Sequence, residues 1–140
     1  MGDRVVTINR MGIFTLAEAQ AILPVVRRIT QEFSQKTELL ISRLESISPT
    51  QTETINELEG QVNEFIKAWH VKIKKLGAVP KGLWLVDFDA GDGYFCWKYP
   101  EPDIAYWHSY QDGFSKRVPL DEHLSLVNSE MTGDDPVLQV

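Results

Sequence analysis

Apolar or small residues recur every three or four positions from residue 16 to residue 47, the spacing of one face of an α-helix. Thr15 and Glu18 can form a capping box at its start, because each side chain can accept a hydrogen bond from the backbone amide of the other residue. Pro24 removes one backbone hydrogen bond, so we expect a kink there rather than an end. The pattern predicts a helix of about residues 15–47 with a continuous stripe made by Leu16, Ala19, Leu23, Val26, Thr30, Phe33, Thr37, Leu40, Leu44 and Ile47.

A second helix is predicted over about residues 49–76. Ser48 is a candidate cap for it, and Thr52 and Thr54 are equally plausible caps. Gly77 suits the left-handed position that follows a helix. The apolar stripe of this helix comprises Ile55, Leu58, Val62, Phe65, Trp69, Ile73 and Leu76. Because the connection is short, the two helices should lie antiparallel as a hairpin.

Three short segments after the hairpin, residues 83–88, 94–99 and 104–109, are rich in aromatic and β-branched residues. Clusters of Gly and Asp or of Pro separate them, which is typical of strands joined by tight turns. The predicted fold is therefore α+β, with a long antiparallel helical hairpin packed against a small three-stranded antiparallel β-meander. We expect one domain over residues 13–120, preceded by an N-terminal arm at 1–12 and followed by an acidic, flexible tail at 121–140.

Alternation along the strands sorts their side chains into two faces. Cys96 and His108 can share one face, while Trp97 and Trp107 take the other. One face must pack on the helices, and the other is left for a pocket or an interface. Both faces carry large aromatic residues, so the sequence does not decide which is which.

The predicted hairpin is about 45 Å long at 1.5 Å per residue, whereas six-residue strands cover only about 20 Å. The sheet therefore cannot cover the distal apolar residues, which are Leu39, Leu40, Ile41, Leu44, Ile47, Ile55 and Leu58. We expect a homodimer in which two hairpins form a four-helix bundle. A free antiparallel coiled coil is the alternative.

Composition narrows the class of protein. The net charge of −6 argues against a nucleic-acid binder, which needs an excess of Lys and Arg to neutralise phosphates. A local basic cluster of Lys72, Lys74, Lys75 and Lys81 is expected to close the end of the second helix. The single cysteine excludes an intramolecular disulfide, and no run of apolar residues reaches membrane-spanning length. We therefore expect a cytoplasmic protein with no membrane segment.

A metal site is one functional hypothesis for the aromatic segment. Asp87, Cys96, Glu101 and His108 are all residue types that bind metals, and adjacent strands could bring Cys96 and His108 together. Their spacing matches no zinc or iron motif. The alternative is that Cys96 is a small buried apolar residue and that His108 orients a neighbour. The acidic turn at residues 87–93 lacks the spacing of a calcium loop and is predicted to be a plain hairpin turn.

Acid–base chemistry and partner binding are the other hypotheses. Tyr106 could join the same polar cluster, where burial would shift pKa values, whereas Arg117 is expected to pair with a carboxylate and fix the third turn. The aromatic binding surface would be formed by Trp84, Trp97 and Trp107. The leading expectation is a non-enzymatic binding or interaction module using this aromatic sheet. A metal-dependent or acid–base enzyme is the alternative, with no cofactor specified.

A combination of short motifs carries a family resemblance over roughly residues 13–120. The chain reads FTLAEA near its start, then GLWLVDF, CW, YWH and GF-x-x-R. The motif positions in the second half are Gly82, Leu83, Val86, Asp87, Phe88, Cys96, Trp97, Glu101, Ile104, Trp107, His108, Gly113, Phe114 and Arg117. In these features the sequence resembles an uncharacterised bacterial family of domain-of-unknown-function proteins. The resemblance implies no activity, cofactor or substrate.

Overall fold

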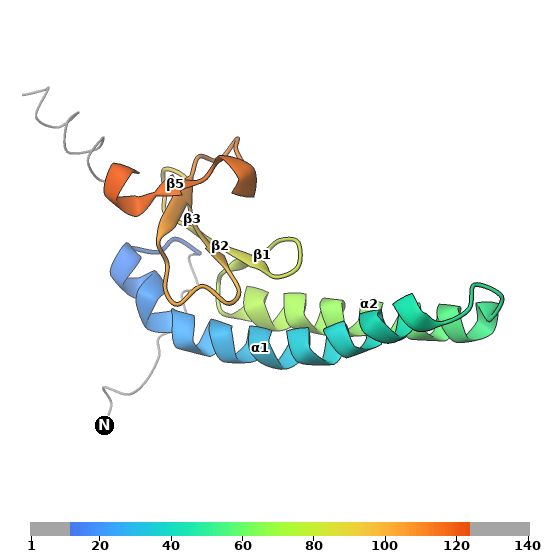
Figure 1. Cartoon of the computed structure of the whole chain (residues 1–140). Coiled ribbons are helices and arrows are strands. Elements are labelled where there is room, and N and C mark those ends of the chain that lie inside the picture. Colours follow the sequence, from blue (N-terminus) through green and yellow to red (C-terminus); the bar gives the residue numbers. More distant parts are fainter. Residues whose placement is uncertain (1–11, 124–140) are drawn as a thin grey trace, which may run out of the picture.

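The computed structural model describes residues 12–123. Helices α1 (Leu16–Ser46) and α2 (Thr52–Lys75) form an antiparallel hairpin, and a sheet packs on one end of it (Figure 1). The α+β class and the hairpin are thus confirmed. The predicted arm and most of the predicted tail, at 1–11 and 124–140, lie outside the described residues. Residues 121–123 continue a helical turn that begins at 120, so the part of the tail that is described is helical.

The sheet has five strands rather than the three predicted. Strands β2 (Leu85–Asp89), β3 (Tyr94–Lys98) and β4 (Tyr106–His108) correspond to the predicted meander. Strands β1 (Val79–Pro80) and β5 (Val118–Pro119) extend it on either side, in the antiparallel order β1-β2-β3-β4-β5. Each added strand has two residues and contains a proline, so neither produces an alternating pattern in the sequence.

The helix ends follow the sequence signals in two of three cases. The Thr15 hydroxyl accepts a hydrogen bond from the Glu18 amide, and the Glu18 carboxylate accepts one from the Thr15 amide, which confirms the capping box. Gly77 follows α2 with φ 91°, and its amide donates to the carbonyl oxygen of Lys74. None of the three candidate caps, Ser48, Thr52 and Thr54, is used, because α2 begins at Thr52 after Gln51 and has no side-chain cap. The Ser48 hydroxyl instead bonds that of Thr50 within the inter-helical turn.

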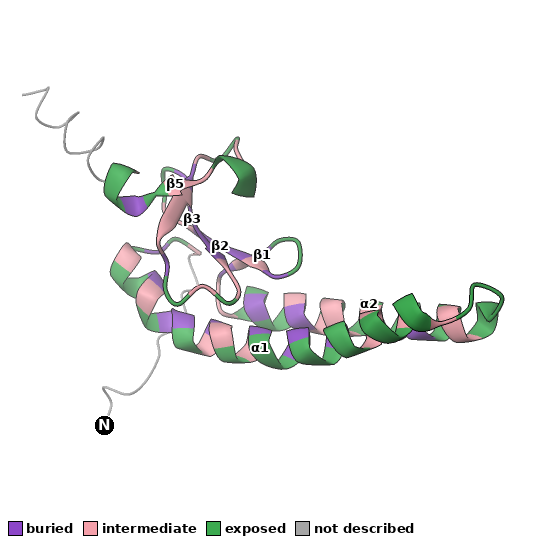
Figure 2. Ribbon diagram, in the orientation of Figure 1, coloured by how far each residue is buried: buried purple, intermediate pink, exposed green. Residues whose placement is uncertain are grey.

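The core lies between the hairpin and one face of the sheet. Figure 2 shows buried residues along β2 and along the part of α1 and α2 beneath it. Val86, Phe88 and Trp97 are fully buried there and pack with Trp69 of α2. The Trp69 and Trp84 rings meet edge to face with centroids 4.9 Å apart. The face that carries these residues is therefore the packing face, and its opposite is free for a site.

The distal half of the hairpin extends beyond the sheet (Figure 1). Leu58 is buried there in the single chain, whereas Leu39 is 73% exposed. The other distal apolar residues are partly covered, namely Leu40, Ile41, Leu44, Ile47 and Ile55. The two helices therefore shield much of this stripe themselves, and pairing of two hairpins stays a prediction. Within residues 12–123, no helix combines the length and apolar character needed to cross a bilayer.

Two buried threonines of α1 differ in their hydrogen bonding, and this gives a matched pair of substitutions. The Thr30 hydroxyl accepts from the Trp69 indole at 3.0 Å, whereas the Thr37 hydroxyl has no partner among the described residues. Thr37→Val should raise the free energy of unfolding by about 1 kcal/mol, because it removes an unsatisfied buried hydroxyl at nearly constant volume. Thr30→Val should lower it by about 1–2 kcal/mol, because it leaves the indole N–H unpaired. Urea denaturation measures both, and midpoint shifts in the same direction would contradict this assignment.

Candidate metal centre

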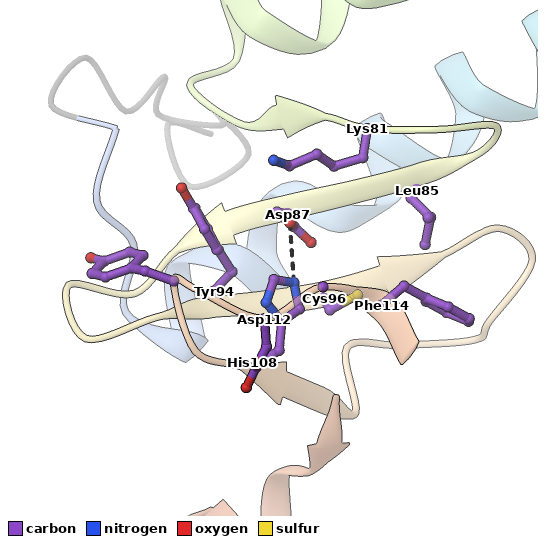
Figure 3. A pocket seen from close by; sticks show the side chains of 10 residues that line it. Lys81, Leu85, Asp87, Tyr94, Cys96, His108, Asp112 and Phe114 are labelled. Carbon is purple, nitrogen blue, oxygen red and sulfur yellow. Dashed lines mark hydrogen bonds and ion pairs between the residues drawn. The ribbon is translucent and has the colours of Figure 1, made fainter. Parts of the chain in front are cut away.

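Three polar side chains converge on the sheet face that points away from the helices. Asp87 of β2 lies directly opposite Cys96 of β3, while His108 of β4 pairs with Tyr94, two residues from Cys96. Alternation therefore places all three on one face. A carboxylate oxygen of Asp87, Sγ of Cys96 and a ring nitrogen of His108 all lie within 4.8 Å of one another (Figure 3). Each of the three residues is at least 97% buried, with 3%, 1% and 3% of its surface exposed, respectively.

The hydrogen bonds of His108 fix the direction of its lone pair. Its Nδ1 lies 2.9 Å from the carbonyl oxygen of Ser109, and because a carbonyl oxygen only accepts, Nδ1 carries a proton. In the neutral ring the lone pair then sits on Nε2, which lies 3.2 Å from Oδ2 of Asp87. A backbone carbonyl that holds one imidazole nitrogen while the other faces acidic groups is the usual environment of a metal-bound histidine.

Burial dominates the electrostatics of the cluster. Desolvation raises the pKa of Asp87, and the neighbouring His108, Cys96 and Lys81 only partly oppose it. Desolvation also raises the pKa of the Cys96 thiol to about 12, with a further rise from Asp87 and an opposing effect of Arg117. Without a metal, burial therefore disfavours the charged forms of both side chains, and the Cys96 thiol keeps its proton at neutral pH. A divalent cation would favour the charged forms instead, because it binds the thiolate and the carboxylate.

The arrangement does not match a nucleophilic relay. In a Cys–His–Asp relay, one ring nitrogen faces the thiol and the other faces the carboxylate. Here the Nδ1 side of His108 is occupied by the Ser109 carbonyl, and Asp87 lies at Nε2. The Cys96 thiol also remains protonated at neutral pH because of its raised pKa. The three groups thus converge on a point rather than forming a chain.

Convergence on a point suits a tetrahedral ion. Ligands held at about 2.0–2.3 Å from zinc lie about 3.3–3.8 Å from one another. The 3.2 Å between Oδ2 and Nε2 is close to this separation, and Sγ of Cys96 lies within 4.8 Å of both atoms. Among the residues that the structure describes, no fourth Asp, Glu, Cys or His joins the cluster. A metal held here would therefore have three protein ligands and one open position.

A pocket of about 190 Å³ opens on the cluster. Its lining residues are Lys81, Leu85, Asp87, Tyr94, Cys96, His108, Tyr110, Asp112, Gly113 and Phe114 (Figure 3). The sequence pattern predicts Lys81 at the end of α2, whereas the structure places it in the lining of the pocket. Lys81 directly follows β1, and its backbone amide donates a hydrogen bond to the carbonyl oxygen of Leu85. The pairing of β1 with β2 brings Lys81 to the pocket. A two-residue strand leaves no alternating pattern in the sequence, so this pairing was not predictable.

Glu101 and Arg117 form a second group beside the cluster rather than part of it. The Arg117 guanidinium binds both carboxylate oxygens of Glu101 and lies over the rings of Tyr106 and Phe114 at 3.9 and 4.3 Å. Its Nη1 also lies 3.9 Å from Sγ of Cys96. The expected pairing of Arg117 with a carboxylate is thus present. Glu101, predicted as a candidate ligand, lies outside the three-residue cluster and pairs with Arg117 instead.

The expected aromatic surface is not formed by its three tryptophans. Trp84 and Trp97 are 6% and 0% exposed and belong to the core. Trp107 is only partly covered, stacks on His123 with ring centroids 4.0 Å apart and donates to Asp92. This prediction is wrong for Trp84 and Trp97, because these side chains fill the space between the sheet and the hairpin.

The acidic turn between β2 and β3 is a hairpin, as predicted. The Ala90 amide donates to the carbonyl oxygen of Gly93, and the Gly91 amide donates to the Asp89 carboxylate. At Gly93 a Cβ atom would lie 2.3 Å from the Trp107 ring. Glycine at this position therefore lets β4 approach the turn closely.

Asp87→Asn should stabilise the metal-free protein. Because burial raises the folded-state pKa of Asp87, the folded protein loses stability as pH rises from the unfolded value of 3.8 through the folded one. Asparagine removes this loss, and its amide can donate to Nε2 of His108. Chelator-treated Asp87→Asn should therefore melt at a higher temperature than wild type at pH 7, and the gain should vanish near pH 3. A lower melting temperature than wild type at pH 7 would contradict this.

Fold and site together define a small α+β protein with a buried Asp–Cys–His cluster at the base of a pocket. The chain belongs to the family of uncharacterized conserved proteins designated DUF2203, whose profile matches residues 12–120. This confirms the family resemblance found in the sequence. Neither the curated proteins nor the solved structures give a match.

Proposed function

We propose that this protein binds a transition-metal ion through Asp87, Cys96 and His108, with zinc as the expected metal. The observation that carries the proposal is that a sulfur, a nitrogen and an oxygen donor from three strands lie within 4.8 Å of one another at the base of a pocket. Thiolate and imidazole ligands suit zinc, and three protein ligands with an open position are typical of zinc sites that bind a further ligand. Such a protein is a metal-dependent binding module.

The groups around the cluster support the same proposal. The Ser109 carbonyl orients His108, and the Arg117 guanidinium favours the charged form of Cys96. Outer-shell partners of this kind hold ligands in place and raise metal affinity. In contrast, an interaction module built on aromatic residues loses its support, because Trp84 and Trp97 are buried. A thiol ligand also needs a reducing compartment, so we retain the cytoplasm as the expected location.

The test is metal analysis of the untagged full chain. The protein is purified without chelators, dialysed against metal-free buffer and analysed for zinc, iron, copper, manganese and nickel. The proposal expects about one zinc per chain, bound again at the same ratio after chelation and reloading. If the chain binds no transition metal even at micromolar excess, the proposal is wrong and the cluster is a structural hydrogen-bonding group.

A further inference from the structure

Once a metal is bound, one cation beside the cluster still has no ion-pair partner among the described residues. A divalent cation would be neutralised by the Asp87 carboxylate and the Cys96 thiolate, with His108 neutral. The positive charge of Arg117 is matched by its two bonds to Glu101. Lys81 then remains, and it forms no ion pair within the part of the chain that the structure describes. Its charge lowers the pKa of Asp87, and its Nζ lies 5.6 Å from the centroid of the Tyr94 ring. A cation that forms no ion pair within residues 12–123 thus lies beside the open position.

The other carboxylate of the pocket, Asp112, adds a formal negative charge but is held in place by hydrogen bonds. Asp112 accepts a hydrogen bond from the Ser109 hydroxyl at 3.0 Å, and its amide donates to the same hydroxyl. These bonds tie it to its own turn. Lys81, in contrast, reaches over the pocket from the segment after β1, on the side where Asp87 and Tyr94 lie (Figure 3).

The remaining walls are apolar and the space is small. Leu85 and Phe114 line the pocket beside the polar cluster, and Phe114 is 39% exposed. The volume of about 190 Å³ lies below the roughly 300–1,000 Å³ of sites for drug-sized ligands. A ligand that fits is therefore a small molecule with one negative end and a compact apolar body.

We propose that the open position takes a small organic monocarboxylate. Its carboxylate oxygen binds the metal in place of water and is paired with Lys81, while its apolar part lies against Leu85 and Phe114. This inference rests on the metal site proposed above. A single negative charge suffices, because Lys81 is the one cation among the described residues that line the pocket and the Asp112 carboxylate on its wall repels added negative charge, so a carboxylate fits this position better than a phosphate dianion.

The experiment uses the full chain loaded with cobalt(II), a spectroscopic substitute for zinc. Cobalt bound to Cys96 should give a sulfur-to-cobalt charge-transfer band in the near ultraviolet and visible bands that respond to the fourth ligand. Acetate, benzoate and inorganic phosphate are titrated at constant ionic strength. Benzoate should shift the visible bands at lower concentration than acetate, because its ring contacts the apolar walls, and phosphate should bind more weakly than benzoate.

Lys81→Gln is the test of the proposed ion pair, and Lys72→Gln is its matched control. Lys72 lies in the last turn of α2 and is exposed, so its replacement changes the net charge equally without touching the pocket. Lys81→Gln should weaken benzoate binding about tenfold, equivalent to about 1.4 kcal/mol, while Lys72→Gln and Lys81→Arg should remain near wild type. Cobalt affinity without carboxylate should change little in any of these variants.

The outcomes separate the two proposals. If cobalt gives no charge-transfer band, the metal site itself is wrong. If the band forms but neither carboxylate shifts the visible spectrum, the metal site stands and the carboxylate inference fails. A stronger response to phosphate than to benzoate overturns the carboxylate assignment, and equal benzoate affinities of Lys81→Gln and wild type overturn the role of Lys81.

Discussion

Replacing His108 with alanine is expected to lower zinc affinity by about 100-fold or more. The substitution removes the imidazole whose Nε2 faces Asp87 and whose Nδ1 is held by the Ser109 carbonyl. Two ligands then remain, Asp87 and Cys96, and burial raises the pKa of both, which disfavours the charged forms that bind a cation. Competition with a chromophoric chelator measures the affinity of wild type and variant under the same conditions.

A matched control for this variant is His70→Ala. His70 lies on α2, where its ring contacts Trp69, and it is not part of the cluster. Its removal should leave zinc affinity unchanged. Because His108 is buried, its replacement could also weaken the fold, so Cys96→Ala provides a second variant that removes a ligand with a smaller loss of volume. Wild-type zinc affinity in both ligand variants would contradict the assignment.

Replacing Arg117 with methionine should lower the free energy of unfolding by about 2–4 kcal/mol. The guanidinium binds both oxygens of Glu101 in a part of the protein where the two side chains are 13% and 23% exposed. Glu101 also accepts from the Lys98 amide, and its carbonyl oxygen accepts from the Trp97 indole. The variant would leave the carboxylate without its cation and loosen the turn that holds Trp97.

A double-mutant cycle separates this ion pair from general loss of packing. Glu101→Gln in the Arg117→Met background removes the unpaired charge, while its amide oxygen can still accept from the Lys98 amide. The double variant should therefore unfold at a higher urea concentration than Arg117→Met alone. If the two substitutions were simply additive, the pair would contribute nothing beyond its packing on Tyr106 and Phe114.

The sequence was informative where a signal spans many residues. The stripe of α1 runs for more than eight turns, so its extent and the hairpin were predictable. Alternation correctly placed Cys96 and His108 on one face and Trp97 on the other. It could not decide which face packs on the helices, because Trp97 and Tyr106 lie on opposite faces and either could belong to a core. Packing with Trp69 and Phe14 decides it in the folded chain.

The candidate site was only partly predictable for a related reason. Asp87, Cys96 and His108 converge because β2, β3 and β4 pair in one particular register, and register depends on the turns as well as on the strand residues. Residue type alone groups Glu101 with these three, whereas its pairing with Arg117 depends on a contact between residues 16 positions apart. Lys81 reaches the pocket through β1, which is too short to leave a pattern.

The central claim is that Asp87, Cys96 and His108 hold a metal ion in one coordination sphere, and zinc X-ray absorption spectroscopy of the loaded full chain tests it most directly. The account predicts one sulfur neighbour at about 2.3 Å together with nitrogen and oxygen neighbours at about 2.0–2.2 Å, including the outer-ring signal of one imidazole. The sulfur contribution should disappear in Cys96→Ser and the imidazole contribution in His108→Ala. A first shell of oxygen atoms alone, unchanged in both variants, would contradict the account.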